Sequence, residues 1–153
     1  GAPGVRVVQA DHVLGLGAGR NVGYVRTPAH STPGHTLGSP SWPWTAWEAG
    51  RCLNMVYADS LTAISSRDYR FSDHPQRVTS FRKAIATVAG LPCDILLTPH
   101  PDASGFWEKV ARRNGDHDAT PLIDANACRD YAVNATKRLD ARLAAERATA
   151  TAM

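Results

Sequence analysis

Short apolar runs alternate with polar turns through the first sixty residues, a pattern typical of β structure. Three runs rich in Val, Tyr or Trp predict strands: Val5 to Val8, Asn21 to Thr27 and Ser41 to Trp47. A fourth run, Leu53 to Asp59, is mostly apolar between polar flanks and predicts a buried strand.

The apolar period changes after residue 75. Between Pro75 and Gly90 four apolar residues fall on one face of an α-helix: Val78, Phe81, Ile85 and Val88. Pro75 suits the first turn, Asp73 is a candidate N-cap, and Gly90 is a stop signal. Asp94 to Thr98 then predicts a compact buried strand, and the spacing from Asp124 onward predicts a second amphipathic helix. This order of elements predicts an α/β layered fold.

Composition and charge narrow the classes of function. With 153 residues, 43% of them hydrophobic and 20% charged, the chain is expected to form one globular domain spanning residues 1–153. Its formal net charge is +3, but lysines and arginines are scattered singly or in pairs, which argues against a nucleic-acid partner. No apolar stretch reaches the roughly 18 residues of a membrane span, so we expect no membrane association of that kind.

Two histidines each stand in a rigid turn after a strand-like run. His35 follows Pro33-Gly34, and His100 lies between Pro99 and Pro101. Such turns hold an imidazole in a fixed direction, as a metal ligand requires. Zinc takes three or four protein ligands, so two histidines predict only part of a metal site. The alternative at His35 is a histidine that merely caps a turn, and at His100 it is a histidine that serves only in packing.

The segment Tyr57-Ala58-Asp59-Ser60-Leu61-Thr62 lies between these histidines, at the end of a predicted buried strand. Asp59 has the chemistry of a metal ligand or base, and the hydroxyls of Ser60 and Thr62 can donate hydrogen bonds to a substrate anion. The alternative, equally supported by the residues, is that Asp59 and Ser60 only close the strand end. A serine-hydrolase interpretation is weak because the sequence has no Gly-x-Ser-x-Gly elbow.

The three cysteines are Cys52, Cys93 and Cys128. Cys93 precedes a predicted strand and Cys128 begins the second helical pattern. A bridge between these two would tie that helix to the sheet and would contribute about 3–4 kcal/mol by chain entropy. We favour this pairing, with Cys52 left free. Three reduced thiols in a cytoplasmic protein are the alternative.

Several ordered motifs resemble the metallo-β-lactamase superfamily. The run Thr32-Pro33-Gly34-His35-Thr36-x-Gly38-Ser39, followed by Ser41-Trp42-x-Trp44, resembles its second zinc-ligand turn. The runs Tyr57-Ala58-Asp59-Ser60-Leu61 and Leu91-Pro92-Cys93-Asp94-Ile95-Leu96-Leu97-Thr98-Pro99-His100-Pro101 resemble the third subclass of class B β-lactamases. The contexts of Cys93 and Cys128 also fit the disulfide of that subclass. The likeness runs from about Val5 to Leu143.

The resemblance implies an αββα sandwich with two zinc ions along one edge of its sheets. His35 would be the third histidine on the first zinc, His100 the histidine on the second, and Ser60 and Thr62 would hold the carboxylate of the β-lactam. A zinc-bound hydroxide would attack the lactam carbonyl, and the second zinc would stabilise the departing nitrogen anion. Asp59 would support the strand end without binding zinc. The implied activity is hydrolysis of β-lactam antibiotics, carbapenems included, by a periplasmic or secreted enzyme.

The sequence also departs from the family pattern. The His-x-His-x-Asp-His motif that supplies the remaining zinc ligands is absent and is expected upstream of Gly1, as is a signal peptide. Leu37 and Pro40 replace the usual Pro and Thr of the His35 turn. We therefore expect roughly the C-terminal half of the fold, with little activity unless a complementary N-terminal segment is present. Another hydrolase of this fold (a lactonase or thioesterase) and an inactive truncated fragment are the alternatives.

Overall fold

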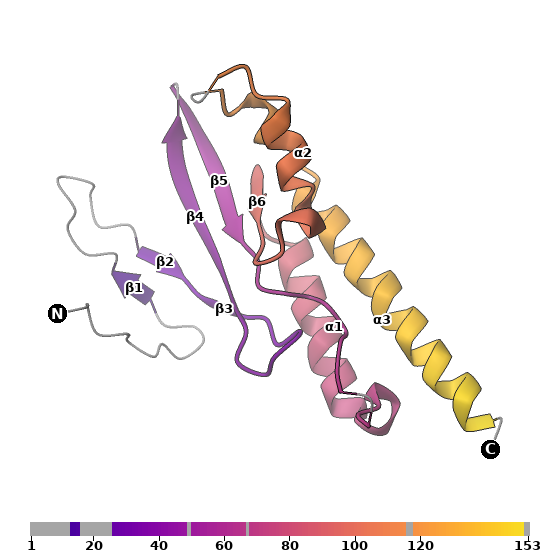
Figure 1. The fold of residues 1–153 in the computed structure, drawn as a ribbon. Coiled ribbons are helices and arrows are strands. Elements are labelled where there is room, and N and C mark those ends of the chain that lie inside the picture. Colours follow the sequence, from indigo (N-terminus) through magenta and orange to yellow (C-terminus); the bar gives the residue numbers. More distant parts are fainter. Residues whose placement is uncertain (1–12, 16–25, 49, 67, 116–117, 152–153) are drawn as a thin grey trace, which may run out of the picture.

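The computed structural model describes residues 13–15, 26–48, 50–66, 68–115 and 118–151, and within them it forms two β-sheets (Figure 1). Strands β1 (Val13–Gly15) and β2 (Arg26–Pro28) are an antiparallel pair. The larger sheet has the order β3-β4-β5-β6, and its strands are β3 (His30–Ser31), β4 (Pro40–Glu48), β5 (Arg51–Tyr57) and β6 (Ile95–Leu97). Its first three strands are antiparallel neighbours, whereas β6 runs parallel to β5.

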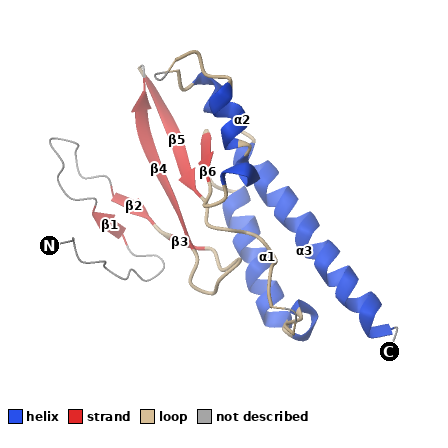
Figure 2. Cartoon of the chain, viewed as in Figure 1, coloured by secondary structure: helices blue, strands red, loops and turns tan. Residues whose placement is uncertain are grey.

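Three α-helices complete the fold: α1 (Pro75–Ala89), α2 (Phe106–Ala111) and α3 (Ala127–Thr151). Three short 3-10 helices lie between them: η1 (Phe71–Asp73), η2 (Pro101–Ser104) and η3 (Thr120–Leu122). Helices α1 and α3 lie side by side on one side of the larger sheet (Figure 2). Among the described residues, no helix combines the length and the apolar character that a membrane span requires.

The core lies between the larger sheet and these two helices. Val56 of β5 and Leu96 of β6 point toward the helices, where Phe81 of α1 and Leu139 of α3 are fully buried. The apolar residues whose spacing predicted the second helix therefore lie on the buried face of α3, which packs on α1 and the sheet.

Most predicted elements are confirmed, with shifted ends. The run Ser41 to Trp47 lies within β4, whereas β5 begins and ends two residues before the predicted Leu53 to Asp59. The expected strand Val5 to Val8, and residues 21–25 of the expected strand Asn21 to Thr27, lie outside the described residues. Helix α2 was not predicted, since six partly exposed residues carry almost no periodic signal.

The predicted N-cap of α1 is wrong. Asp73 lies in η1, and His74 occupies the N-cap position without a side-chain hydrogen bond. The 3-10 turn takes up the polar residues before Pro75, so the carboxylate of Asp73 does not reach the first turn of α1.

The face of the larger sheet that points away from α1 and α3 is apolar along its length. Paired residues lie on the same side of a sheet, so the register fixes this set: Trp42, Trp44, Ala46, Leu53, Met55, Tyr57, Ile95 and Leu97. Two helices already cover the opposite face. An apolar sheet face of this extent is typical of a sheet that packs against a second sheet.

Glu146 near the end of α3 is the one acidic residue that is buried in the described part of the chain, at 7% exposed. Its Oε1 accepts hydrogen bonds from Nε of Arg142 (2.6 Å) and the amide of Phe71 (3.1 Å), and Oε2 accepts one from the amide of Ser72 (2.8 Å). Burial alone raises the pKa of this carboxyl, but hydrogen bonds from Arg142, Ser72 and Phe71 outweigh it and lower the pKa from 4.5 to about 2.

This carboxylate makes the stability of the protein pH-dependent. A depressed folded-state pKa stabilises the fold above pH 4.5, and that contribution is lost as the pH falls toward 2. We expect Glu146→Gln to lower the free energy of unfolding at pH 7 by up to about 3 kcal/mol. The variant should also show little of the loss of stability that the wild type shows between pH 4.5 and pH 2. Urea unfolding at a series of pH values measures this. Glu108→Gln, at an exposed residue, is the matched control. If the free energies of unfolding of the wild type and Glu146→Gln differed by the same amount at every pH, Glu146 would not be the source of the pH dependence.

Candidate functional site

One edge of the larger sheet collects the segments that carry the candidate chemistry. Because β5 and β6 are parallel, the chain leaves both at the same edge, toward Ser60 and toward His100. Strand β4 is antiparallel to β5, and its early residue Trp42 pairs with Tyr57 at the end of β5. The β3–β4 turn that carries His35 therefore meets the other two segments at this edge.

The His35 turn is closed by buried polar contacts. The amide of Thr32 donates to the carbonyl of Ser39 (2.8 Å), and the Thr32 hydroxyl lies 2.7 Å from that of Ser41. All three residues are almost fully buried. Breaking these contacts would leave buried polar groups without a partner, which is costly, so they hold the base of the turn.

Gly34 lets this turn lie directly against the segment after β5. A Cβ atom at this position would stand 2.6 Å from the carbonyl oxygen of Ser60 and 2.9 Å from Cδ2 of Leu61. Carbon cannot approach a backbone oxygen so closely, which explains why glycine precedes His35. The next residue then donates its amide to the same oxygen, from N of His35 to O of Ser60 (3.0 Å).

Helix α1 holds the His35 turn from its other side. Arg77 donates from Nη2 to the carbonyl oxygen of Gly34 (2.9 Å) and, more weakly, to that of His35 (3.4 Å). The backbone of the His35 turn is thus fixed by a strand segment and a helix, while its imidazole is exposed.

The residues after β5 form a compact hydroxyl pair. The Ser60 hydroxyl donates to Oγ1 of Thr62 (3.1 Å), and the Ser60 amide donates to Oδ1 of Asp59 (2.7 Å). Asp59 therefore closes the strand end by accepting from its neighbour. The Thr62 hydroxyl proton has no acceptor among the described residues, so it is available to an anion.

Tyr131 of α3 fixes the backbone on both sides of Ser60. Its hydroxyl accepts from the amide of Leu61 (3.0 Å) and donates to the carbonyl oxygen of Asp59 (3.3 Å). Burial first, and then the charge of Asp59, raise the pKa of this hydroxyl, so it stays protonated and keeps donating.

His100 is the N-cap residue of the short helix η2, which begins at Pro101. Its carbonyl oxygen accepts from the Thr98 hydroxyl (2.8 Å) and from the amide of Ala103 (2.8 Å), and its side chain is exposed. Pro101 restricts the backbone that follows. As at His35, the main chain is held and the ring is left open to the outside.

All four residues predicted to bind metal or substrate line one hollow of about 340 Å³: His35, Ser60, Thr62 and His100. Four further residues complete it: Ile64, Asp102, Ala103 and Arg138. Segments more than sixty positions apart are thus brought to one place. Among the described residues, no group of three or more His, Cys, Asp and Glu side chains is placed to hold a metal ion.

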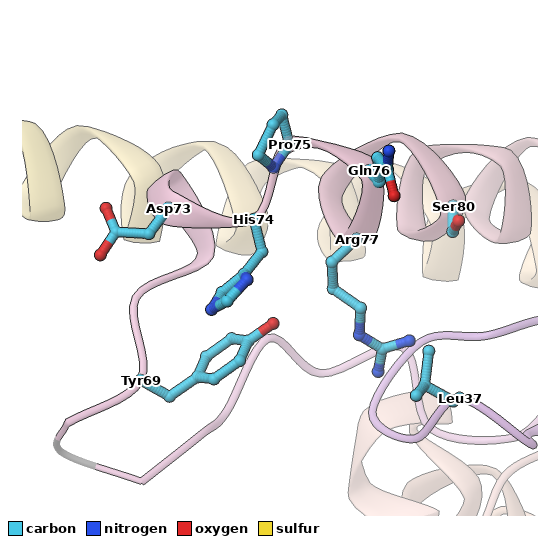
Figure 3. Close-up of a pocket in the computed structure, with 8 residues that line it drawn as sticks. All are labelled: Leu37, Tyr69, Asp73, His74, Pro75, Gln76, Arg77 and Ser80. Atoms are coloured by element: carbon cyan, nitrogen blue, oxygen red, sulfur yellow. The ribbon is translucent and has the colours of Figure 1, made fainter.

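A larger hollow of about 550 Å³ lies elsewhere, at the start of α1 (Figure 3). There the ring of His74 stacks on Tyr69 with 4.6 Å between ring centroids, and Arg77 and Leu37 complete the wall. A histidine stacked on an aromatic ring beside proline is explained by packing. We therefore take the smaller hollow as the candidate site.

A disulfide joins Cys93 and Cys128, as predicted, and Cys52 is free and exposed. Both bridged cysteines are buried, one just before β6 and the other in the first turn of α3. Tyr131 follows Cys128 by one turn of the helix, so the bridge anchors the same part of α3 that contacts the Ser60 segment.

Sequence reasoning did not single out Arg77, Tyr131 or Arg138. Tyr131 was expected only as a core position of a helix, and neither arginine stands in a motif. Their roles at this edge depend on which face α1 and α3 turn toward the loops. No local pattern in the sequence carries that information.

Comparison with solved structures places this arrangement in a class of hydrolase folds. The chain is similar to MEM-A1, a subclass B3 metallo-β-lactamase isolated from a soil metagenome library (42% identity, TM-score 0.81, covering 94% of this chain and 53% of that one). It is similar to SMB-1 in complex with mercaptoacetic acid (40%, TM-score 0.81, covering 92% and 52%). It is also similar to MIM-1 from Novosphingobium pentaromativorans (39%, TM-score 0.78, covering 95% and 49%). No family model matches the sequence.

The mixed sheet covered by helices on one face, with its loops at one edge, is half of an αββα metallo-β-lactamase sandwich. The chain belongs to the metallo-β-lactamase superfamily, and within it to the third subclass of class B, subclass B3. It spans about half the length of the enzymes that it matches and corresponds to their C-terminal half.

Proposed function

We propose that this chain is the C-terminal half of a zinc-dependent β-lactamase, which hydrolyses the β-lactam amide bond of antibiotics. The carrying observation is the hollow that His35, Ser60, Thr62 and His100 share, in a chain whose solved relatives are subclass B3 metallo-β-lactamases. Carbapenems are included among the proposed substrates.

The donor set fits part of a zinc site. Two exposed imidazoles on rigidly held backbones are suitable zinc ligands. They are fewer than the three or four protein ligands that zinc takes, so the described residues do not complete a site. We propose that His35 and His100 each contribute one ligand to a two-zinc site, completed by an N-terminal segment that carries His-x-His-x-Asp-His.

When bound, zinc would supply Lewis-acid activation of water and of the lactam carbonyl. The chain's own residues orient the substrate. Thr62 donates a hydrogen bond to the substrate carboxylate. Ser60 is fixed by two hydrogen bonds, from its hydroxyl to Thr62 and from its amide to the carboxylate of Asp59. Both histidines line the same hollow as this anchor.

The apolar sheet face described above is the proposed contact for the missing half. An αββα sandwich packs two sheets face to face, and this chain supplies one sheet with helices on its outer side. A second polypeptide segment with its own apolar sheet face would bury this surface and bring its histidines to the same edge.

The disulfide supports an extracytoplasmic setting. Buried disulfides form and persist in the periplasm or outside the cell, where thiols are not kept reduced. We propose a periplasmic or secreted enzyme on this basis.

Completion of the site is the direct test. The chain is joined behind the N-terminal segment of a subclass B3 enzyme such as MEM-A1, and the product is here termed the completed enzyme. Nitrocefin and imipenem absorbance is followed with and without zinc, for the chain alone, the segment alone and the completed enzyme. We expect zinc-dependent turnover only by the completed enzyme, because only it has enough ligands.

Calorimetric zinc titration of the same three proteins gives a second readout. Tight binding by the completed enzyme without β-lactam turnover, but with turnover of a lactone or thioester, would replace the β-lactamase proposal by another hydrolase of this fold. Robust turnover by the chain alone would contradict the shared-site proposal.

A further inference from the structure

A cationic side chain on the wall of the candidate site has no hydrogen-bond or ion-pair partner in the part of the chain that the structure describes. Arg138 of α3 lines the hollow together with His35, Ser60, Thr62 and His100. It is exposed, and it makes no hydrogen bond or ion pair with any described residue. Asp102, the acidic residue on the same wall, forms no ion pair with it.

The position of Arg138 along α3 follows from its neighbours. Leu139 and Ala135 are buried in the core, and Tyr131 lies two turns earlier with its hydroxyl bonded on both sides of Ser60. The positive charge of Arg138 is close enough to that hydroxyl to favour its ionised form, although burial keeps the pKa of Tyr131 raised overall. Arg138 thus lines the same hollow as the segment that carries the hydroxyl pair.

The chemistry of these groups matches a carboxylate. The Ser60 hydroxyl is used in donating to Thr62, which leaves the Thr62 proton for an external acceptor. A guanidinium presents several N–H donors in a planar fork that suits the two oxygens of a carboxylate. Both residues line one hollow, and between them they offer one hydroxyl donor and one charged fork to an anion.

We propose that Arg138 binds the carboxylate of the β-lactam together with Thr62, and that it determines specificity for anionic substrates. This inference rests on the proposed function. An exposed arginine is ordinarily solvated and contributes little, so the expected effect is on substrate binding and is moderate. Because the contact forms on substrate binding and persists, loss of the charge raises KM and leaves kcat nearly unchanged.

The test compares Arg138→Gln and Arg138→Lys in the completed enzyme, with benzylpenicillin and its neutral methyl ester as substrates. We expect Arg138→Gln to raise KM for the acid about 5- to 20-fold and to change KM for the ester less than about 2-fold. Arg138→Lys should restore part of the loss, since it keeps the charge but not the fork. Arg129→Gln is the matched control, because Arg129 is exposed on the same helix and lines a different hollow.

A second readout needs neither zinc nor turnover. In ¹⁵N NMR spectra of the 153-residue chain, millimolar benzylpenicillin is expected to shift the Arg138 Nε–H and Thr62 amide signals, and the methyl ester is not. Equal shifts with acid and ester, or equal changes of KM for both, would overturn the role of Arg138. Acid-dependent shifts in a protein whose completed form hydrolyses no β-lactam would support this role and contradict the proposed function alone.

Discussion

Replacing His100 with alanine is expected to lower zinc-dependent β-lactam hydrolysis by the completed enzyme at least about 100-fold. The imidazole is one of the few donors that this half of the fold can offer to a metal at the sheet edge. Removing a first-sphere ligand costs more than the 10- to 100-fold that loss of a residue supporting a ligand typically costs. His35→Ala is expected to have an effect of the same size or larger. Initial rates with nitrocefin, at saturating and limiting zinc, measure both variants.

The matched control is His74→Ala. His74 is also exposed and precedes α1, but it stacks on Tyr69 outside the candidate hollow. We expect it to retain activity within about 2-fold and to bind zinc normally. Far-UV circular dichroism checks that each variant is folded. If His100→Ala kept both zinc affinity and turnover, His100 would not be a ligand, and its turn would have only a structural role.

Removing the Cys93–Cys128 bridge is expected to give the largest change in stability. The bridge joins residues 35 positions apart in the sequence, so it removes many conformations from the unfolded chain. We expect Cys93→Ala/Cys128→Ala to lower the free energy of unfolding by about 3–4 kcal/mol. Urea unfolding at pH 7 measures this, and a reducing agent should affect the wild type in the same direction.

The free thiol provides the control for this experiment. Cys52→Ser removes an exposed cysteine of β5 that has no disulfide partner, and we expect a change within about 0.5 kcal/mol. The double variant should also loosen the contact of Tyr131 with the Ser60 segment, because the bridge anchors the start of α3. A loss of stability below about 1 kcal/mol would indicate that the unfolded chain is little constrained by the bridge.

Prediction from sequence succeeded where a local pattern corresponds to one structure. The one-face apolar spacing between Pro75 and Gly90 predicted α1 almost to the residue, because only a helix buries residues at that period. It failed at Asp73, which is a good capping residue by type. The 3-10 turn η1, fixed by the buried ring of Phe71 and by Glu146 of α3, places Asp73 outside the first turn of α1.

Some residues of the candidate site could likewise be predicted from the sequence, and others could not. Ser60, Thr62 and the two histidines could be selected from sequence because rigid turns and strand ends are local features. Arg138 and Arg77 could not, since each comes from a helix whose orientation is set by packing far from the site.

By itself, therefore, the sequence determined helices α1 and α3, strands β4 to β6, the rigid turns that hold the two histidines, and the family resemblance, since all of these follow from short-range patterns of residues. Only the tertiary structure decided that turns more than sixty positions apart meet at one sheet edge, and that α3 adds a guanidinium and a tyrosine hydroxyl there. The physical reason is that strand direction, register and helix packing depend on how all the elements pack together in one core. No single segment of the sequence contains that information.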